Sequence, residues 1–141
     1  MTTDALDAPP PRLRVGRWLA GGLAVAFGLA TVMEGGVVLF GGPAARAEAG
    51  HVVPFVLMFN FGAGFVYVLG GLATLLRRRW AVWIAQALAL STVLVFAAFG
   101  VHVLSGGTYE LRTLVAMTLR SAFWVAQALV LPRLLEGGRH A

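Results

Sequence analysis

Residues 52–76 read VVPFVLMFNFGAGFVYVLGGLATLL, a stretch without a single charged side chain. An α-helix rises about 1.5 Å per residue, so about 20 apolar residues cross the ~30 Å hydrocarbon core of a bilayer. The stretch lacks the alternation of apolar and polar residues that marks a strand of a membrane β-barrel. It therefore predicts one transmembrane helix from Val52 to Leu76.

Three other stretches are similarly long and apolar: Trp18 to Phe40, Trp80 to Leu104 and Leu111 to Leu131. Their ionisable side chains are few, with Glu34 in the first, His102 in the second, and Arg112 and Arg120 in the third. Backbone groups inside lipid must pair within their own segment, which an α-helix achieves. The chain is therefore predicted to be all-α, an integral membrane four-helix bundle with up-down-up-down order.

The composition excludes several other classes of protein. The chain is 59% hydrophobic and 12% charged, with a mean hydropathy of +0.82. Soluble domains average about 45–50% apolar and about 25% charged residues, so this chain has too much apolar surface for water. High hydropathy excludes intrinsic disorder, and the lack of cysteine excludes disulfides and thiolate metal sites. Gly62, Gly64, Gly70 and Gly71 lie inside an apolar stretch and do not form a phosphate-binding loop.

The arginines indicate how the bundle is oriented. Eight of them flank one side of the four stretches: Arg12, Arg14, Arg17, Arg77, Arg78, Arg79, Arg133 and Arg139. On the other side, the connecting loops contain Arg46 alone. Cytoplasmic loops are enriched in arginine and lysine, so we expect both termini and the 77–79 turn in the cytoplasm. The expected location is the inner (plasma) membrane.

The expected organisation is a single membrane domain, residues 18–132, between two cytoplasmic tails. The tail 1–17 contains a run of prolines and is expected to be disordered, and the tail 133–141 follows the last helix. Residues 12–49 also resemble a signal peptide, with small residues at its far end. Their apolar segment exceeds the usual length of about 7–15 residues and contains Glu34, so a retained first helix is the preferred interpretation.

Small and polar residues indicate which face of each helix packs inward, because hydrophobic force between helices is weak in lipid. The first stretch has glycine at every seventh position: Gly21, Gly28, Gly35 and Gly42. The other three stretches each collect small and polar residues on one side. In the second these are Asn60, Gly64, Tyr67, Gly71 and Thr74, and in the third Ala87, Ser91, Ala98, His102 and Ser105. In the fourth they are Glu110, Thr113, Met117, Arg120, Ser121, Trp124 and Gln127. We expect each helix to turn this stripe toward the bundle interior.

Charged residues inside a bilayer are costly, and so they point to function or to specific pairing. Counted from the outer boundary, Glu34 lies about 9 Å deep and Arg120 about 13 Å deep. Side chains lean toward the N-terminus of their own helix, and these two helices run in opposite directions, so the two charged groups come to one level. We expect a Glu34–Arg120 ion pair that either fixes helix register or takes part in function.

Other polar groups gather near the same level and predict a pocket open to the outer side. Asn60 is about 12 Å deep, Met117 about 9 Å and His102 about 3 Å, with Glu110 at the mouth. A small organic molecule, a quinone or a lipid head group would suit such a site, and binding without turnover is the preferred function. The residues expected to contact this ligand are Glu34, Asn60, Tyr67, Met117, Arg120 and Trp124.

Three alternative functions remain open at this stage. The first is a transition-metal or haem site built from His102, Glu110 and His51, because imidazole and carboxylate ligands suit zinc, iron or copper(II). The second is a dimeric, proton-coupled transporter in which Glu34 exchanges a proton. The third is an accessory subunit of a larger membrane complex, in which the inward stripes only hold the helices together. The expected partners are the bilayer and a second copy or larger complex, but no nucleic acid.

Overall fold

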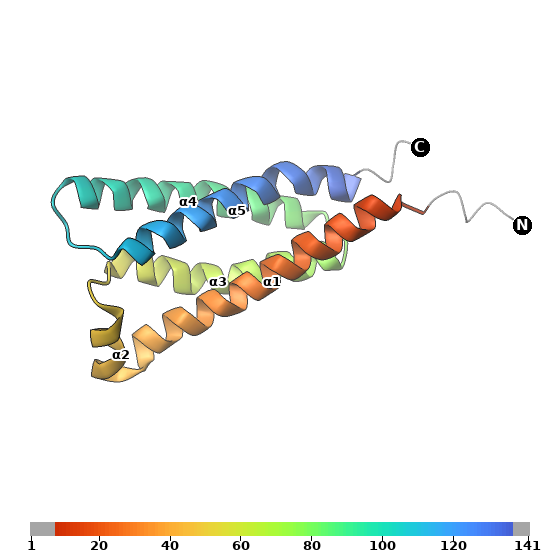
Figure 1. The fold of residues 1–141 in the computed structure, drawn as a ribbon. Helices are drawn as coiled ribbons and strands as arrows, with labels where there is room; N and C mark the ends of the chain where they lie inside the picture. The colour runs from red at the N-terminus through yellow and green to blue at the C-terminus, as the bar shows by residue number, and fades with distance from the viewer. Residues whose placement is uncertain (1–7, 137–141) are drawn as a thin grey trace, which may run out of the picture.

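A computed structural model of the protein describes residues 8–136, where all regular structure is helical (Figure 1). Within this range the helices are α1 (Pro11–Phe40), α2 (Gly42–Ala49), α3 (Pro54–Leu75), α4 (Trp80–Leu104) and α5 (Leu111–Glu136). All except α2 are long and apolar enough to cross a membrane. The predicted all-α bundle of four spans is confirmed, and the chain is a multi-pass helical membrane protein.

Several boundaries differ from the sequence-based expectation, including those of α3, which runs from Pro54 to Leu75 and not from Val52 to Leu76. α1 begins at Pro11, so residues 11–17 of the tail expected to be disordered are helical, and proline suits a helix start because its φ is already fixed there. The loop expected at 41–51 contains α2, and α5 continues to Glu136. Hydropathy detects only the apolar part of a helix, so it misses polar helical turns that extend beyond the lipid. The outer parts of the two tails, 1–7 and 137–141, lie outside the described residues.

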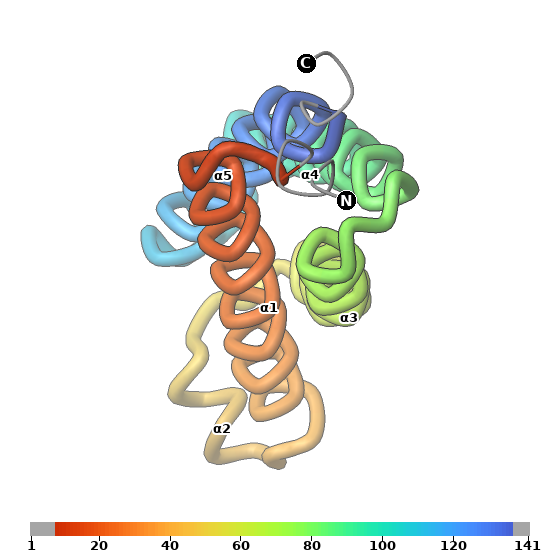
Figure 2. The backbone as a smooth tube through the Cα atoms, turned by 90° about the vertical axis from the view of Figure 1, so that its right-hand side faces the viewer, coloured from red at the N-terminus to blue at the C-terminus, as the bar shows by residue number. Residues whose placement is uncertain are grey.

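The four long helices alternate in direction, so the start of α1, the α3–α4 turn and the end of α5 lie at one end of the bundle (Figure 1). This arginine-rich end is the one expected to face the cytoplasm. α1 packs mainly along α3, and α4 packs mainly along α5. Toward the opposite end α1 moves away from α5, and α2 lies beside the end of α1 (Figures 1 and 2).

Glycine pairs bring the backbones of α1 and α3 into contact. A Cβ atom on Gly28 would lie 2.7 Å from the carbonyl oxygen of Gly64, and one on Gly71 would lie 2.8 Å from that of Gly21. Larger side chains would hold the helices apart, because real Cβ atoms do not approach backbone so closely. The expected packing stripe of α1 is confirmed at Gly21, Gly28 and Gly35, which are all buried. Gly42 instead begins α2, with a φ of +81°.

The packing face expected for α4 is wrong. Ala87 and Ala98 are exposed, whereas the buried residues of this helix are Ala81, Ala85, Leu88, Ala89, Thr92 and Phe99. Small residues occur all around α4, so their positions do not single out one side. The inward face is set by Leu88 and Phe99, two large side chains that fill the space between the helix pairs.

An aromatic layer fills the centre of the bundle. The ring centroids of Tyr67 and Trp124 lie 4.8 Å apart, and Phe27 stacks on Tyr67 at 5.7 Å. Phe123 meets the rings of both Phe27 and Trp124 edge to face. Tyr67 and Trp124 are fully buried, so this layer separates the two ends of the bundle by tightly packed side chains.

The turn after α3 has an arginine, Arg77, at the left-handed position that glycine usually occupies. Arg77 has a φ of +57°, and the N–H of Arg78 donates to the carbonyl of Ala73 at 2.8 Å, which is the bonding pattern of a Schellman cap. Glycine normally occupies the left-handed position of such a cap. An L-residue with a side chain pays about 1–2 kcal/mol to adopt that conformation. Arg77 therefore carries local backbone strain that glycine would avoid.

We predict that Gly28→Ala destabilises the bundle by about 1–3 kcal/mol, because the added methyl group would meet main-chain atoms of α3 that cannot rotate away. Reversible unfolding in detergent micelles, followed by circular dichroism, measures this loss. Gly22→Ala is the matched control, since a Cβ atom there has no neighbour within 4 Å. It should be neutral or slightly stabilising, and equal losses at both positions would contradict backbone contact.

Candidate functional site

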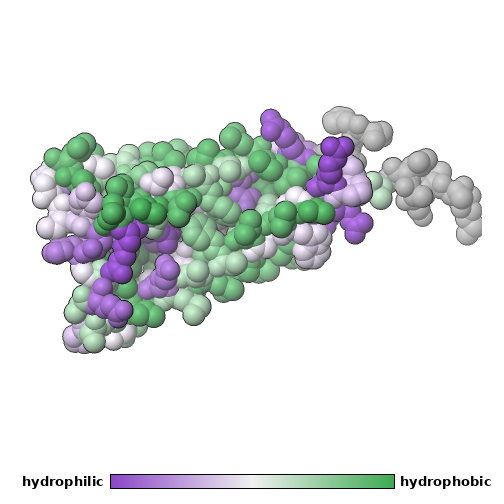
Figure 3. All heavy atoms as spheres, viewed as in Figure 1, coloured by the Kyte–Doolittle hydropathy of each residue, from purple (hydrophilic) through white to green (hydrophobic). Residues whose placement is uncertain are grey.

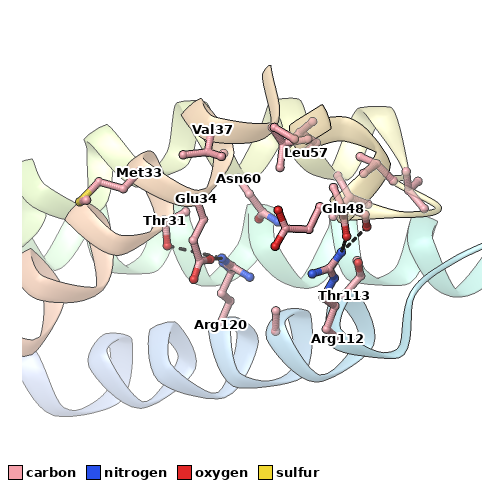
Figure 4. Close-up of a pocket in the computed structure, with 18 residues that line it drawn as sticks. Thr31, Met33, Glu34, Val37, Glu48, Leu57, Asn60, Arg112, Thr113 and Arg120 are labelled. Carbon is pink, nitrogen blue, oxygen red and sulfur yellow. Dashed lines mark hydrogen bonds and ion pairs between the residues drawn. The ribbon is translucent and has the colours of Figure 1, made fainter. Parts of the chain in front are cut away.

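A cavity of about 670 Å³ opens between α1, α2, α3 and α5, in the half of the bundle farther from the arginine-rich end (Figure 4). Its polar lining consists of Thr31, Glu34, Glu48, Asn60, Arg112, Thr113 and Arg120. The rest of its wall is apolar and consists mainly of valine, leucine and alanine. The cavity exists because α1 follows α3 and so moves away from α5 at this end.

Arg120 occupies the inner end of the cavity and is the best-buried charged group of the site. Its side chain is only 7% exposed, and its Nη2 lies 3.9 Å from Glu34 Oε2 and 3.5 Å from Thr31 Oγ1. Charge-assisted hydrogen bonds are usually about 2.7–2.9 Å long, so both contacts are loose. The guanidinium carbon also lies 5.6 Å from the ring centroid of Phe27, a distance typical of a cation–π contact. The structure thus brings Glu34 and Arg120 together as a weakly closed pair.

The two members of this pair differ strongly in their surroundings. The Glu34 side chain is 77% exposed and lies beside that of Arg120 (Figure 4). Arg120 has a buried Nε that makes no hydrogen bond within residues 8–136. A buried cation with incomplete pairing is expensive, and a further hydrogen-bond acceptor would stabilise it. The inner end of the cavity is therefore suited to an oxygen atom of a ligand.

Arg112 holds α2 in place as the outer wall of the cavity. Its Nη2 donates to the carbonyl oxygen of Glu48 at 2.9 Å and also to that of Ala49. These carbonyls lie at the C-terminus of α2, where they have no partner in the helix and where the helix dipole favours a cation. Arg112 therefore has a structural role, although the sequence shows it only as an ionisable residue near the start of the fourth span.

Asn60 connects the cavity wall to the core beneath it. Its Nδ2 donates to the sulfur of Met117 at 3.6 Å, while its Oδ1 is buried without a hydrogen-bond partner among the described residues. In Figure 4 the side chains of Asn60 and Glu48 both point into the cavity. The cavity thus offers an amide and a carboxylate near its middle, between the two arginines.

Only part of the expected ligand-binding set lines the cavity. Glu34, Asn60 and Arg120 do, whereas Tyr67, Met117 and Trp124 are fully buried in the core. Angular position on a helix predicts which residues face inward, but it does not separate the wall of a cavity from the packed layer below it. Tyr67 and Trp124 belong to the aromatic layer.

The three residues expected to hold a metal have other partners. His102 Nε2 donates to the carbonyl of Thr108 at 3.0 Å, and the His51 ring lies 3.2 Å from Glu110 Oε1. None of the three lines the cavity. In the part of the chain that the structure describes, no three His, Cys, Asp or Glu side chains come together. The metal and haem interpretation therefore has no supporting group of ligands there.

Glu110 joins the two loops at the end of the bundle that carries α2. The backbone N–H of His51 donates to Glu110 Oε1 at 2.8 Å. This hydrogen bond, with the one from the His51 ring, lowers the pKa of Glu110 because both stabilise the ionised carboxylate. Glu110 thus ties the segment before α3 to the start of α5.

Four polar residues of the wall were not predicted from sequence as ligand contacts, namely Thr31, Glu48, Arg112 and Thr113. Glu48 was missed because α2 was not predicted. The signal for α2 was present, since Gly42-Pro43 is a typical helix start and Gly50 a typical residue after a helix end. Arg112 and Arg120 are eight residues apart, about 80° beyond two full helical turns, and so they lie on one broad side of α5.

Comparison with protein-family models, with curated proteins and with solved structures gives no match for this chain. The class is therefore defined by the fold and the site together. The protein is a multi-pass membrane protein of four spanning helices, with a partly polar cavity in one half of the bundle.

The Glu34–Arg120 pair can be tested by a double-mutant cycle. Glu34→Gln and Arg120→Leu should each destabilise the bundle, and the double variant should lose less than their sum, with a coupling energy of at least about 0.5 kcal/mol. Unfolding free energies in micelles supply the measurement. Glu34→Gln combined with Arg133→Leu is the control and should be additive, because Arg133 lies at the opposite end. Full additivity of the Glu34 and Arg120 changes would show that the two do not interact.

The Glu110 link predicts a pH dependence at its end of the bundle. The pKa of Glu110 is lower in the folded protein than in the unfolded chain, where it is about 4.3. The ionised carboxylate therefore contributes its full stabilisation of the fold above about pH 4.3. This contribution is lost as the pH falls through the folded-state pKa. The side-chain carboxyl resonance of Glu110, measured by NMR, should therefore titrate with a midpoint below about 4.3. The Gly107 amide donates to the carbonyl of His102 and should stay constant. A Glu110 midpoint at or above the unfolded value would contradict the assignment.

Proposed function

We propose that the protein binds an amphiphilic molecule, a lipid or a quinone-like compound, in the cavity between α1, α2, α3 and α5. Its polar head would lie at Arg120, and it would be bound without chemical turnover. The observation that carries the proposal is a cavity of about 670 Å³ with a buried, loosely paired guanidinium at its inner end. Pockets for small ligands typically measure about 300–1,000 Å³.

The mixed lining supports an amphiphilic ligand. Arg120, Asn60 and Thr113 offer hydrogen bonds, while Val56 and Leu57 belong to the apolar part of the wall. A carbonyl or anionic oxygen would complete the hydrogen bonding of Arg120. A hydrocarbon tail would pack against the apolar wall, whereas a fully polar solute would make no favourable apolar contact there.

The position of the opening supports entry from the membrane. Met33, Glu34 and Val37 line the cavity on α1 and are exposed, and between Val15 and Phe40 the other exposed residues of this helix are apolar. Figure 3 shows hydrophilic atoms gathered in a hollow between hydrophobic surfaces near the α2 end. A ligand whose tail extends through this opening would remain in contact with acyl chains.

The packed centre of the bundle favours binding over transport. Tyr67, Trp124 and Met117 are fully buried on the inner side of the cavity. A transport path that used Glu34 would have to cross this layer. An accessory role would require a surface that binds a partner protein. The exposed apolar side chains of the described helices could contact lipid acyl chains as well as a partner, so they do not favour this role.

Ala116→Trp tests the proposal, because Ala116 lines the cavity and the indole ring would fill part of it without removing a charge. The protein is purified in mild detergent from a membrane extract, and bound lipids and quinones are quantified by mass spectrometry. We expect a near-stoichiometric amphiphile with the unchanged chain and at least a tenfold lower amount with Ala116→Trp, about the effect of losing 1.4 kcal/mol.

Ala122→Trp is the matched control, since Ala122 is exposed on the same helix and does not line the cavity. It should keep the ligand, and thermal unfolding should show that both variants are folded. An amphiphile retained equally by both variants, or none bound to the unchanged chain, would overturn the proposed function.

A further inference from the structure

We propose a second binding site, independent of the cavity, in which Arg14, Arg17 and Arg77 hold the phosphate of an anionic lipid at the arginine-rich end. The site is formed where the first turns of α1 meet the α3–α4 turn and the end of α5. It lies at the opposite end of the bundle from the cavity. Figure 3 shows hydrophilic atoms concentrated at this end, beside hydrophobic surface.

The three arginines line one shallow depression. Arg14 and Arg17 come from α1 and Arg77 from the turn, while Leu134 and Leu135 of α5 close the other side. Its volume of about 10 Å³ admits roughly one water-sized atom, so a phosphate would rest on it with one oxygen inserted. The leucines would lie against the start of the acyl chains.

Among the described residues, the charges in this depression have no counterpart of opposite sign. Within residues 8–136 the ion pairs are His51–Glu110 and Glu34–Arg120, so none involves these three arginines. The Nε of Arg17 is buried without a hydrogen-bond partner in the same range. Three guanidinium groups converging in this way repel one another, and a phosphate would replace the repulsion with charge-assisted, bidentate hydrogen bonds.

The backbone of Arg77 is an independent argument for a role of its side chain. Its φ of +57° is the conformation that glycine adopts without strain. Backbone strain is often retained where the side chain serves a function. Glycine at this position would relax the turn but would remove one of the three charges.

The level of the site in the membrane favours a lipid phosphate over a free one. The adjacent Trp18 is 58% exposed, and the Arg17 guanidinium carbon lies 6.0 Å from its ring centroid. Exposed tryptophan is typical of the layer of lipid head groups. The depression therefore lies where lipid phosphates are concentrated.

Arg77→Gly separates the two roles of this residue. Melting temperatures are compared in neutral detergent micelles and in the same micelles with added phosphatidylglycerol, and binding of this lipid is measured by native mass spectrometry. Without the lipid, Arg77→Gly should melt a few degrees higher, because the turn is relaxed. With the lipid, it should lose at least half of the stabilisation that the unchanged chain gains, and its affinity should fall about tenfold, as for one charge-assisted hydrogen bond.

Arg79→Ala is the matched control, because it removes one charge from the same turn but does not line the depression. It should keep the lipid effect, whereas Arg17→Gln should lose it as Arg77→Gly does. An equal loss with Arg79→Ala would show general attraction to a basic surface and overturn the site. The same stabilisation by inorganic phosphate at matched concentration would overturn the assignment to a lipid.

Discussion

Backbone contact between α1 and α3 is the constraint on which the rest of the structure depends. Gly21 and Gly28 on one helix meet Gly71 and Gly64 on the other, and no side chain separates them. The two helices therefore run together as a pair along most of α1. Because α1 stays with α3, it cannot also stay with α5, and the space between α1 and α5 becomes the cavity. A close contact in one place thus produces an opening in another.

The two arginines of the cavity show how one residue type serves two purposes in a membrane protein. Arg112 is exposed and bonds to the free carbonyls of α2, where it completes a helix end. Arg120 is buried and has only distant partners, a carboxylate, a hydroxyl group and an aromatic face. The first arginine is satisfied within the protein. The second keeps a buried Nε without a hydrogen-bond partner in residues 8–136, and the proposed ligand would supply that partner.

Much of the fold could be predicted from sequence because membrane spans are set by length and hydropathy, which are local properties. The convergence of Glu34 and Arg120 also followed from rise per residue and side-chain direction. α2 was missed because it is short and has no apolar stretch. The inward face of α4 was missed because small residues surround that helix. Tyr67 and Trp124 were assigned to the site because angular position does not distinguish a packed interior from a cavity wall.

The way in which α2 is anchored has a consequence for how this protein can change. Arg112 bonds to main-chain carbonyls, which are the same whatever amino acids occupy positions 48 and 49. Substitutions at Glu48 can therefore alter the charge presented to the cavity while the attachment of α2 is preserved. For the proposed ligand, selectivity would in this way be uncoupled from architecture, and the outer wall would be the part of the molecule where new preferences could evolve with little loss of folding.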